Sequence, residues 1–332
     1  MENTSTFQIY TGSGKTFKQK GLKVPAYEPL IVSEDPKNYI PSAGLVDAVN
    51  VALALRQPLL ITGEPGTGKT KLASNIAWEL DIPLLCFFTK TTSTSSDLFY
   101  IYDALQRFHD AQIGKSKPIE EYITLQALGM AILMANPTDN SNKILPAQNQ
   151  IEKPTRSVVL IDEIDKAPRD LPNDILNEIE NMQFKIKESS WEPFVADPEF
   201  SPILILTSNS EKNLPDAFLR RCIFYHIEFP SFDALRQIML KRFGDISNLG
   251  IDWSHNFIDA AIKHFMDIRT LNLRKKPATA EFIAWVNILR VLKINIQTLH
   301  MNDMDKLIRS YSVLAKNVED YNQLKYFAKK VI

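Results

Sequence analysis

"PLLITGEPGTGKTKLASNIAWEL", residues 58–80, joins a short apolar run, a glycine-rich turn and a segment with helical spacing. The run at 58–62 predicts a buried β-strand, and the apolar residues at 72, 73, 76, 77 and 80 predict a helix. The turn between them has the pattern G-x4-G-K-[ST]. A strand, this turn and a helix in that order are typical of a phosphate-binding loop, because the free N–H groups and the positive dipole end of the helix then face the phosphates.

We expect the turn to hold a nucleotide. Gly66 and Gly68 let the backbone approach the phosphates. Lys69 brings a positive charge to the β and γ oxygens, and the Thr70 hydroxyl is a magnesium ligand. An ordinary glycine turn is the alternative for such a segment. The expected nucleotide-binding residues are Gly63, Glu64, Pro65, Gly66, Thr67, Gly68, Lys69, Thr70 and Lys71.

A second Gly-Lys-Thr, at residues 14–16, fails the same test. The position five residues before its glycine is Ile9, where a phosphate loop needs a glycine. The residues that follow cannot form a helix through Gly21 and Pro25. The sequence therefore places the nucleotide at the later of the two loops.

The run "VVLIDE", residues 158–163, predicts a buried strand that ends in two carboxylates. Such a pair is costly to bury unless a cation lies beside it. We expect Asp162 to hold Mg²⁺ through its water shell, and Glu163 to orient and deprotonate the attacking water. An acidic helix start is the alternative, and Asp165 fits that alternative. The two motifs together predict magnesium-dependent hydrolysis of a nucleoside triphosphate.

Apolar runs rich in β-formers alternate with segments of helical spacing over the first 230 residues, and the remainder reads as helices. This alternation predicts an α/β fold, a three-layer sandwich around a five-stranded parallel sheet, followed by a smaller all-helical lid domain. The expected strands are at 58–62, 84–89, 157–162, 202–207 and 222–229. The expected domains are an N-terminal extension at 1–39, an α/β nucleotide-binding domain at 40–230 and a helical lid domain at 231–332.

The composition indicates a reduced, water-soluble environment. The formal net charge of −1 over 332 residues leaves nucleic acid unsupported as a partner, and no apolar stretch approaches the ~20 residues of a spanning helix. We therefore expect no membrane contact and a cytoplasmic location. Cys86 and Cys222 are far apart in sequence, each among apolar neighbours, and are expected to be reduced thiols in the core.

Four motifs in this order, "GEPGTGKT", "LIDEIDKA", "LILTSN" and "LPDAFLRRC", resemble an AAA+ ATPase module over roughly residues 40–300. The lead-in "GLVDAVNVALALRQPLLITGEPGTGKT" is most similar to the MoxR branch. The resemblance implies ATP as the nucleotide, and Asn209 as a sensor of its γ-phosphate. It also implies an arginine finger for the neighbouring subunit's nucleotide. Arg221, next to Cys222, matches that position better than Arg220 does.

For Asn209 the alternative is a polar residue at the end of a strand. For Arg220 and Arg221 the alternative is a salt-bridged pair on the surface. A finger working in trans implies a ring or open spiral of subunits, a hexamer in this family. The MoxR resemblance further implies a partner with a von Willebrand factor A domain, and a chaperone-like role in remodelling, assembling or activating another protein. A nucleotide-gated assembly module with little turnover is the alternative function. Neither the client nor the pathway is identified by the sequence.

Two further segments bear on function: a predicted hairpin that could contact a partner, and a basic segment in the lid. Residues 184–196, "FKIKESSWEPFVA", predict a small hairpin, and we hypothesise that Trp191 and Phe194 at its exposed tip contact a substrate or partner. A surface hairpin without such a role is the alternative. The lid departs from the family pattern, which has an arginine at the start of a late helix. Here "NLRKKPATAEFIAW" offers Arg274, Lys275 or Lys276 just upstream, or simply a solvated basic turn.

Overall fold

The structure is a computed structural model of the whole chain. It describes residues 10, 14, 35–145, 150–209, 213–243 and 255–331. Apart from Gly14, the earlier Gly-Lys-Thr lies outside these residues, as does most of the expected N-terminal extension. The chain divides into two compact units, Tyr39–Glu228 and Phe229–Ile332 with the residues up to Asn38. We describe each unit by itself.

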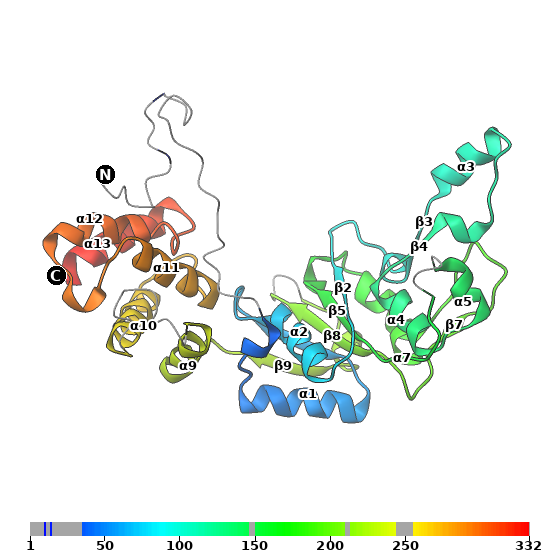
Figure 1. Cartoon of the computed structure of the whole chain (residues 1–332), viewed down its shortest axis with the longest axis horizontal. Coiled ribbons are helices and arrows are strands. Elements are labelled where there is room, and N and C mark those ends of the chain that lie inside the picture. The colour runs from blue at the N-terminus through cyan, green and yellow to red at the C-terminus, as the bar shows by residue number, and fades with distance from the viewer. Residues whose placement is uncertain are drawn as a thin grey trace. The chain divides into compact units, whose positions relative to one another are not determined.

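The first unit is built on a five-stranded parallel sheet, as predicted (Figure 1). The order of its strands is β2-β5-β8-β1-β9. All four pairings are parallel, with Leu60 opposite Leu206 and Ile161 also opposite Leu206. The strands are β1 (Leu59–Gly63), β2 (Leu84–Phe88), β5 (Val158–Asp162), β8 (Ile203–Ser208) and β9 (Ile223–Ile227).

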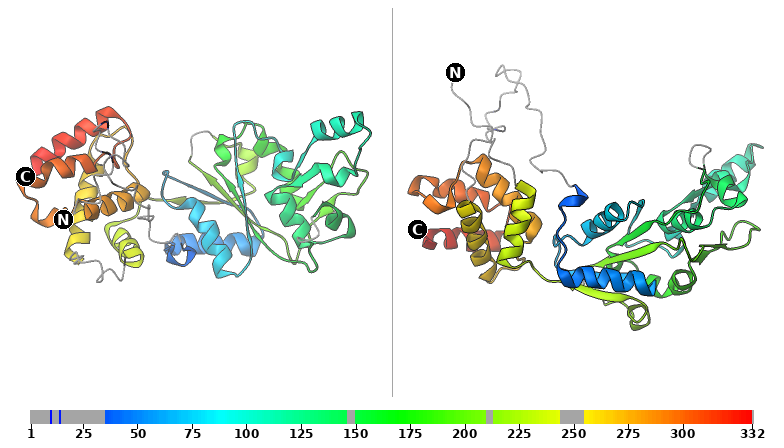
Figure 2. Two further views of the ribbon diagram at one scale, coloured as in Figure 1. Left: turned by 45° about the horizontal axis from the view of Figure 1, so that its top comes forward. Right: turned by 60° about the horizontal axis from the view of Figure 1, so that its bottom comes forward.

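Helices cover both faces of this sheet, which makes the predicted three-layer sandwich (Figure 1 and Figure 2). Alternate strand residues point to opposite faces. Leu59 and Ile61 belong to the core beneath α1 (Ala43–Leu55) and α2 (Lys69–Glu79). Leu60 belongs to a separate core with α4 (Ala127–Ala135). Besides α3, which is described below, the other α-helices among the described residues of this unit are α5 (Asp139–Ile144), α6 (Leu171–Asp174), α7 (Leu176–Asn181) and α8 (Asp216–Leu219).

An arm interrupts the unit between β2 and α4 (Figure 1). Its base is an antiparallel strand pair, β3 (Tyr100–Tyr102) and β4 (Ile123–Leu125). Between them lies helix α3 (Ala104–Gln112), which begins at the N-cap Asp103. The hairpin expected at 184–196 is also present, as β6 (Gln183–Phe184) paired with β7 (Phe194–Val195).

The expectation that this hairpin has an exposed aromatic tip is wrong. Phe194 is buried and its ring stacks on that of Phe184, with centroids 5.4 Å apart. Trp191 is half-buried and packs its edge against Phe194 at 6.1 Å. Phe184 in turn stacks on Phe99 at 5.3 Å. The aromatic side chains are used inside the unit, because stacking on one another and on Phe99 removes their apolar area from water.

All regular elements among the described residues of the second unit are helices, as predicted for the lid. Its core contains Trp285, Phe282, Phe265 and Tyr311, with the buried His264 stacked among them. Its α-helices are α9 (Phe232–Phe243), α10 (His255–Thr270), α11 (Thr279–Val291), α12 (Met304–Ser310) and α13 (Val318–Val331).

The basic turn upstream of α11 is fixed by a buried carboxylate. Asp320 accepts the backbone N–H of Arg274 at 2.8 Å and that of Lys275 at 3.1 Å. Glu281, at the start of α11, accepts the N–H of Ala278 at 3.1 Å. The backbone of the turn is therefore held within the lid, while the basic side chain of Arg274 is exposed.

The expectation for the two cysteines is wrong for Cys86, whose side chain is exposed on β2. The reason is the strand order, because β2 is an edge strand and lacks a neighbour on one side. Cys222 is half-buried, and both thiols are free. Within the described ranges, no helix combines the length and the apolar character needed to cross a membrane.

Candidate active site

The glycine-rich loop between β1 and α2 requires its glycines. Gly63, Gly66 and Gly68 have φ angles of +152°, +79° and +92°, which side chains with a Cβ rarely adopt. A Cβ on Gly63 would lie 2.7 Å from the carbonyl oxygen of Ile227 on β9. The glycines therefore fix the shape of the loop, and the N-terminus of α2 faces the inside of that loop. Among its remaining residues, Glu64, Pro65 and Thr70 are exposed, Lys71 is half-buried and Thr67 is buried.

The ammonium of Lys69 lies inside this loop. The side chain is 6% exposed, and its Nζ donates to the carbonyl oxygens of Gly63 at 2.8 Å and Glu64 at 3.0 Å. Burial lowers the pKa of Lys69, while the charges of Asp162, Asp165 and Glu163 act in the opposite direction. A cation held only by backbone carbonyls can exchange them for an anion, because charged acceptors bind an ammonium more strongly than neutral ones do.

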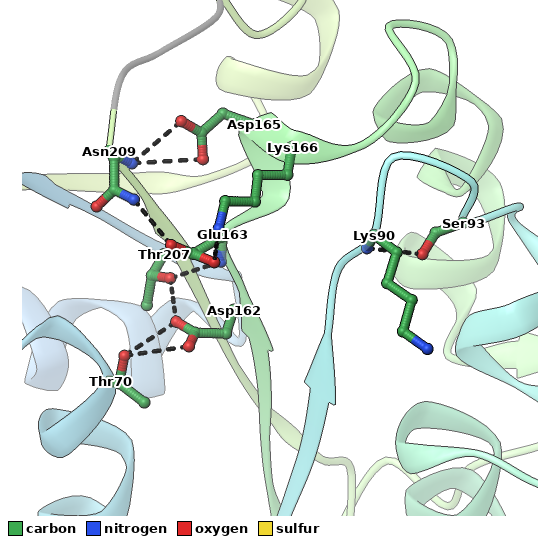
Figure 3. A network of polar contacts seen from close by, with 9 residues as sticks. All are labelled: Thr70, Lys90, Ser93, Asp162, Glu163, Asp165, Lys166, Thr207 and Asn209. Carbon is green, nitrogen blue, oxygen red and sulfur yellow. Dashed lines mark hydrogen bonds and ion pairs between the residues drawn. The ribbon is translucent and has the colours of Figure 1, made fainter. Parts of the chain in front are cut away.

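Oxygen groups from three elements meet at the carboxyl end of β5 (Figure 3). Thr70, in the first turn of α2, donates its hydroxyl to Asp162 at 3.0 Å. Thr207 on β8 donates its hydroxyl to the same carboxylate at 2.5 Å and accepts the backbone N–H of Glu163 at 2.9 Å. The two residues expected to hold magnesium, Thr70 and Asp162, therefore lie in direct contact.

Glu163 leaves the strand in a left-handed conformation, with φ +56°, and its side chain has two partners. Asn209 donates its Nδ2–H to one oxygen at 3.0 Å, and Lys166 forms an ion pair with the other. The backbone N–H of Asn209 is in turn accepted by the buried Asp165 at 3.2 Å. Asp165 thus holds Asn209 and is more than an acidic helix start, because its side chain joins the short 3-10 helix after β5 (Ile164–Lys166) to the residue that follows β8.

Sequence reasoning missed Thr207 and Lys166. Thr207 belongs to the quoted motif "LILTSN", and its place two residues before Asn209 was the available signal. Its contact with Asp162 depends on the register that sets Ile161 opposite Leu206. Lys166, in "LIDEIDKA", is three residues after Glu163, a spacing at which helical side chains meet.

The two candidate finger arginines lie after α8. The guanidinium of Arg221 forms an ion pair with Glu180 of α7 and donates to the carbonyl oxygen of Ala217 at 2.9 Å. Arg220 is exposed at the C-cap of the same helix. Arg221 is thus engaged by its own chain, with partners other than Thr70, Asp162, Glu163 and Asn209.

The chain has weak similarity to solved structures of RuvB. A comparison with curated protein sequences found no match. Two point mutants of RuvB from Thermotoga maritima each have a TM-score of 0.48 at 16% identity; one match covers 85% of this chain and 73% of RuvB, the other 87% and 74%. A third structure, the Holliday junction branch migration motor RuvB of the same organism, has a TM-score of 0.43 at 16% identity over 88% of this chain and 72% of that one.

The decisive comparison is with a protein family. Residues 59–231, more than half of the chain, match the model of the ATPase family associated with various cellular activities (AAA). The match begins at β1 and ends just after β9, so it spans the whole parallel sheet and the loop, carboxylate and asparagine described above. The chain therefore belongs to the AAA family of ATPases.

Proposed function

We propose that this protein is a magnesium-dependent ATPase of the MoxR-like branch that acts as a ring or open spiral of subunits to remodel, assemble or activate a partner protein. The observation that carries the proposal is the hydrogen-bonded network of Figure 3, in which the loop helix, β5 and β8 bring Thr70, Asp162, Glu163 and Asn209 together. These groups are the kinds that bind Mg²⁺ and phosphate oxygens and activate water.

The residues present fit both ATP and Mg²⁺. The three positive-φ glycines place no side chain at three points of the loop before α2, and the buried Lys69 supplies the positive charge that triphosphate oxygens require. Thr70 and Asp162 supply hydroxyl and carboxylate oxygens, the ligands that Mg²⁺ prefers. Mg²⁺ held there would neutralise charge on the phosphate oxygens of ATP.

In the proposed reaction Glu163 takes a proton from the attacking water, and the oxygen of that water forms a bond to the γ-phosphorus as the bond to the β-phosphate oxygen breaks. Asn209 orients Glu163 through its Nδ2–H and would also sense the γ-phosphate. Lys69 stabilises the negative charge of the phosphates. Each of these steps uses a side chain of the network or the loop.

Arg221 or Arg220 would complete the site from the neighbouring subunit. An arginine that stabilises the transferring phosphoryl group in trans can raise the rate by about 10³–10⁵-fold in the best cases. For Arg221 this requires release from Glu180. We further propose the domain boundaries 1–39, 40–230 and 231–332, and a von Willebrand factor A-domain partner. The support for these last points is the motif order and the MoxR-like lead-in at residues 44–70.

The test is hydrolysis of ATP and binding of a fluorescent ATP analogue, both measured over a wide range of protein concentration. Glu163→Gln should lower kcat by about 10²–10⁴-fold, the usual contribution of a general base, while leaving nucleotide affinity within about threefold. Glu79→Gln, an exposed acid at the end of α2, is the matched control and should leave both unchanged. Binding without hydrolysis in the wild type, with or without added client, would instead favour a nucleotide-gated assembly module.

A further inference from the structure

The backbone of Glu163 is fixed, but its carboxylate needs contacts of its own. Glu163 leaves β5 with φ +56° and ψ +50°, a left-handed conformation that residues with a Cβ seldom adopt and that clusters at functional sites. Its backbone N–H is accepted by Thr207 at 2.9 Å. A glutamate side chain keeps much rotamer freedom beyond this backbone, so the backbone alone does not direct the carboxylate.

The carboxylate of Glu163 is held at both of its oxygens, as Figure 3 shows. Asn209 donates its Nδ2–H to Oε1 at 3.0 Å, and the ammonium of Lys166 forms an ion pair with Oε2. With one contact the group could still rotate about the bonded oxygen. Two contacts on two oxygens fix the plane of the carboxylate, and each oxygen keeps a second lone pair for a water.

Lys166 is placed beside Glu163 by a short packed turn. It is the last residue of the 3-10 helix Ile164–Lys166, and side chains three residues apart lie over one another in such a helix. Its backbone N–H is accepted by the carbonyl oxygen of Glu163 at 2.9 Å. Ile164 and Ala167 are buried, so the turn is anchored in the core. The Lys166 side chain therefore starts from a fixed position, and its ammonium reaches Glu163.

The same turn also holds the second contact of the carboxylate. Asp165, the buried middle residue of the turn, accepts the backbone N–H of Asn209 at 3.2 Å. Asn209 in turn donates its side-chain N–H to Glu163. One short turn thus directs the carboxylate of Glu163 from one side through Lys166 and from the other side through Asn209.

A surface salt bridge without a role in the reaction is the alternative for this pair. Both side chains are more than a third exposed, and such pairs add little to the stability of the fold. The position of the pair favours a role in the reaction, because Lys166 contacts the carboxylate proposed as the base. Lys69, by contrast, donates to carbonyl oxygens of the loop. With ATP bound at this end of the sheet, less water would reach the pair and its attraction would increase, because the effective dielectric falls.

We propose that Lys166 is a positioning residue for hydrolysis. Its ammonium, together with Asn209, keeps the carboxylate of Glu163 in the orientation from which it takes the proton of the attacking water. The proposal rests on the proposed function, since it names a further residue of the same site. Lys166 acts through Glu163, so its effect should vanish where Glu163 carries no carboxylate.

Two substitutions of Lys166 test this role by steady-state ATP hydrolysis. Lys166→Met nearly keeps the length of the side chain and removes its charge. It should lower kcat by about tenfold to a hundredfold, the loss that a misplaced catalytic group causes, and leave KM within about threefold. Lys166→Arg keeps a cation and should retain kcat to within about threefold of the wild type. Lys117→Met, which removes an exposed ion pair with Glu121 on the arm, is the matched control and should leave kcat and KM unchanged.

A second background separates positioning from a structural role. In Glu163→Gln no carboxylate remains to be held, so adding Lys166→Met should change the residual hydrolysis by less than about twofold. A merely structural role of Lys166 would lower hydrolysis by the same factor in both backgrounds.

Amine labelling detects the ion pair without turnover. The full chain is acetylated with an N-hydroxysuccinimide ester in the absence of nucleotide, and mass spectrometry measures how fast each lysine reacts. Lys166 should react about two- to fivefold faster in Glu163→Gln than in the wild type, the factor that corresponds to a weak ion pair. Lys117 should react at the same rate in both proteins.

Several results would overturn the role of Lys166. Lys166→Met with the kcat of the wild type is one, and a raised kcat is another, since the pair would then restrain the base. Equal losses in the two backgrounds, or equal labelling of Lys166 with and without the Glu163 carboxylate, would also contradict it. A fall of about tenfold in affinity for a fluorescent ATP analogue, with kcat unchanged, would assign Lys166 to phosphate binding instead. Absence of hydrolysis in the wild type overturns the proposed function itself, whereas hydrolysis that Lys166→Met retains in full overturns only the role of Lys166.

Discussion

Replacing Thr207 by valine removes one hydroxyl and keeps the shape of the side chain. That hydroxyl is fully buried, donates to Asp162 and accepts the N–H of Glu163. It therefore connects the residue proposed to hold magnesium with the backbone of the proposed base. The substitution tests whether this link between β8 and β5 positions both groups.

The expected effect on stability follows from the two contacts. A hydrogen bond to a charged group contributes about 1.5–3 kcal/mol, and a buried N–H left without a partner costs about 1–3 kcal/mol. We expect Thr207→Val to lower the free energy of unfolding by about 3 kcal/mol, and Thr207→Ser to lower it by under about 1 kcal/mol. If the loss of this hydroxyl also weakens Mg²⁺ binding at Asp162 by about 1.4 kcal/mol, the Mg²⁺ concentration for half-maximal hydrolysis rises about tenfold.

The assay is ATP hydrolysis at saturating nucleotide over a titration of Mg²⁺, with urea unfolding of the same variants. Thr207→Ser should retain the Mg²⁺ dependence of the wild type. Thr279→Val in the lid is the matched control, since it removes a buried threonine hydroxyl that has no hydrogen-bond partner among the described residues. A folded Thr207→Val protein with wild-type Mg²⁺ dependence and kcat would refute the reasoning.

Three further outcomes are expected. Arg221→Ala should lower kcat by about a hundredfold or more, with Arg220→Ala close to wild type, and hydrolysis that stays normal in Arg221→Ala at high protein concentration would contradict the trans finger. Gly63→Ala should destabilise the chain by more than about 2 kcal/mol in urea unfolding, because its Cβ meets the carbonyl of Ile227 at 2.7 Å. Burial lowers the pKa of His264 from 6.5 to about 4, so the folded state binds this proton less readily than the unfolded state. About 3 kcal/mol of stability, present above pH 6.5, should be lost as pH falls toward 4, and the loss should be smaller in His264→Phe when acid and neutral urea unfolding are compared.

The parallel sheet could be predicted because each buried strand is a short apolar run bounded by polar turns. The predicted strand at 58–62 and the observed Leu59–Gly63 differ by one residue, as do 202–207 and Ile203–Ser208. The loop and the carboxylate pair are likewise local, since each is a contiguous motif whose chemistry depends on its own residues. The prediction from sequence and the structure agree where the residues of one contiguous segment are sufficient to determine its conformation.

The features that sequence could not predict depend on which segments become neighbours. Thr207 meets Asp162 only through the register of β5 with β8, and Cys86 is exposed only because β2 is an edge strand. Phe194 is expected at an exposed tip, because the sequence does not show that its ring will stack on Phe184, which in turn stacks on Phe99. Leu105 and Phe108 of α3 are exposed, while Asp110 of the same helix is buried and accepts the hydroxyl of Tyr122, a contact between segments twelve residues apart.

The two contacts of Glu163 differ in how firmly they hold it. Its carboxylate oxygens have one partner each, Asn209 on one side and Lys166 on the other, and each oxygen keeps a second lone pair that can accept a water. The ion pair joins side chains that are 40% and 35% exposed, and pairs of this kind contribute about 0–1 kcal/mol. Asn209 is held more firmly, because its backbone N–H is bound by the buried Asp165. The ion pair with Lys166 is therefore the contact that opens at the smaller cost, and Asn209 then still holds the Glu163 carboxylate.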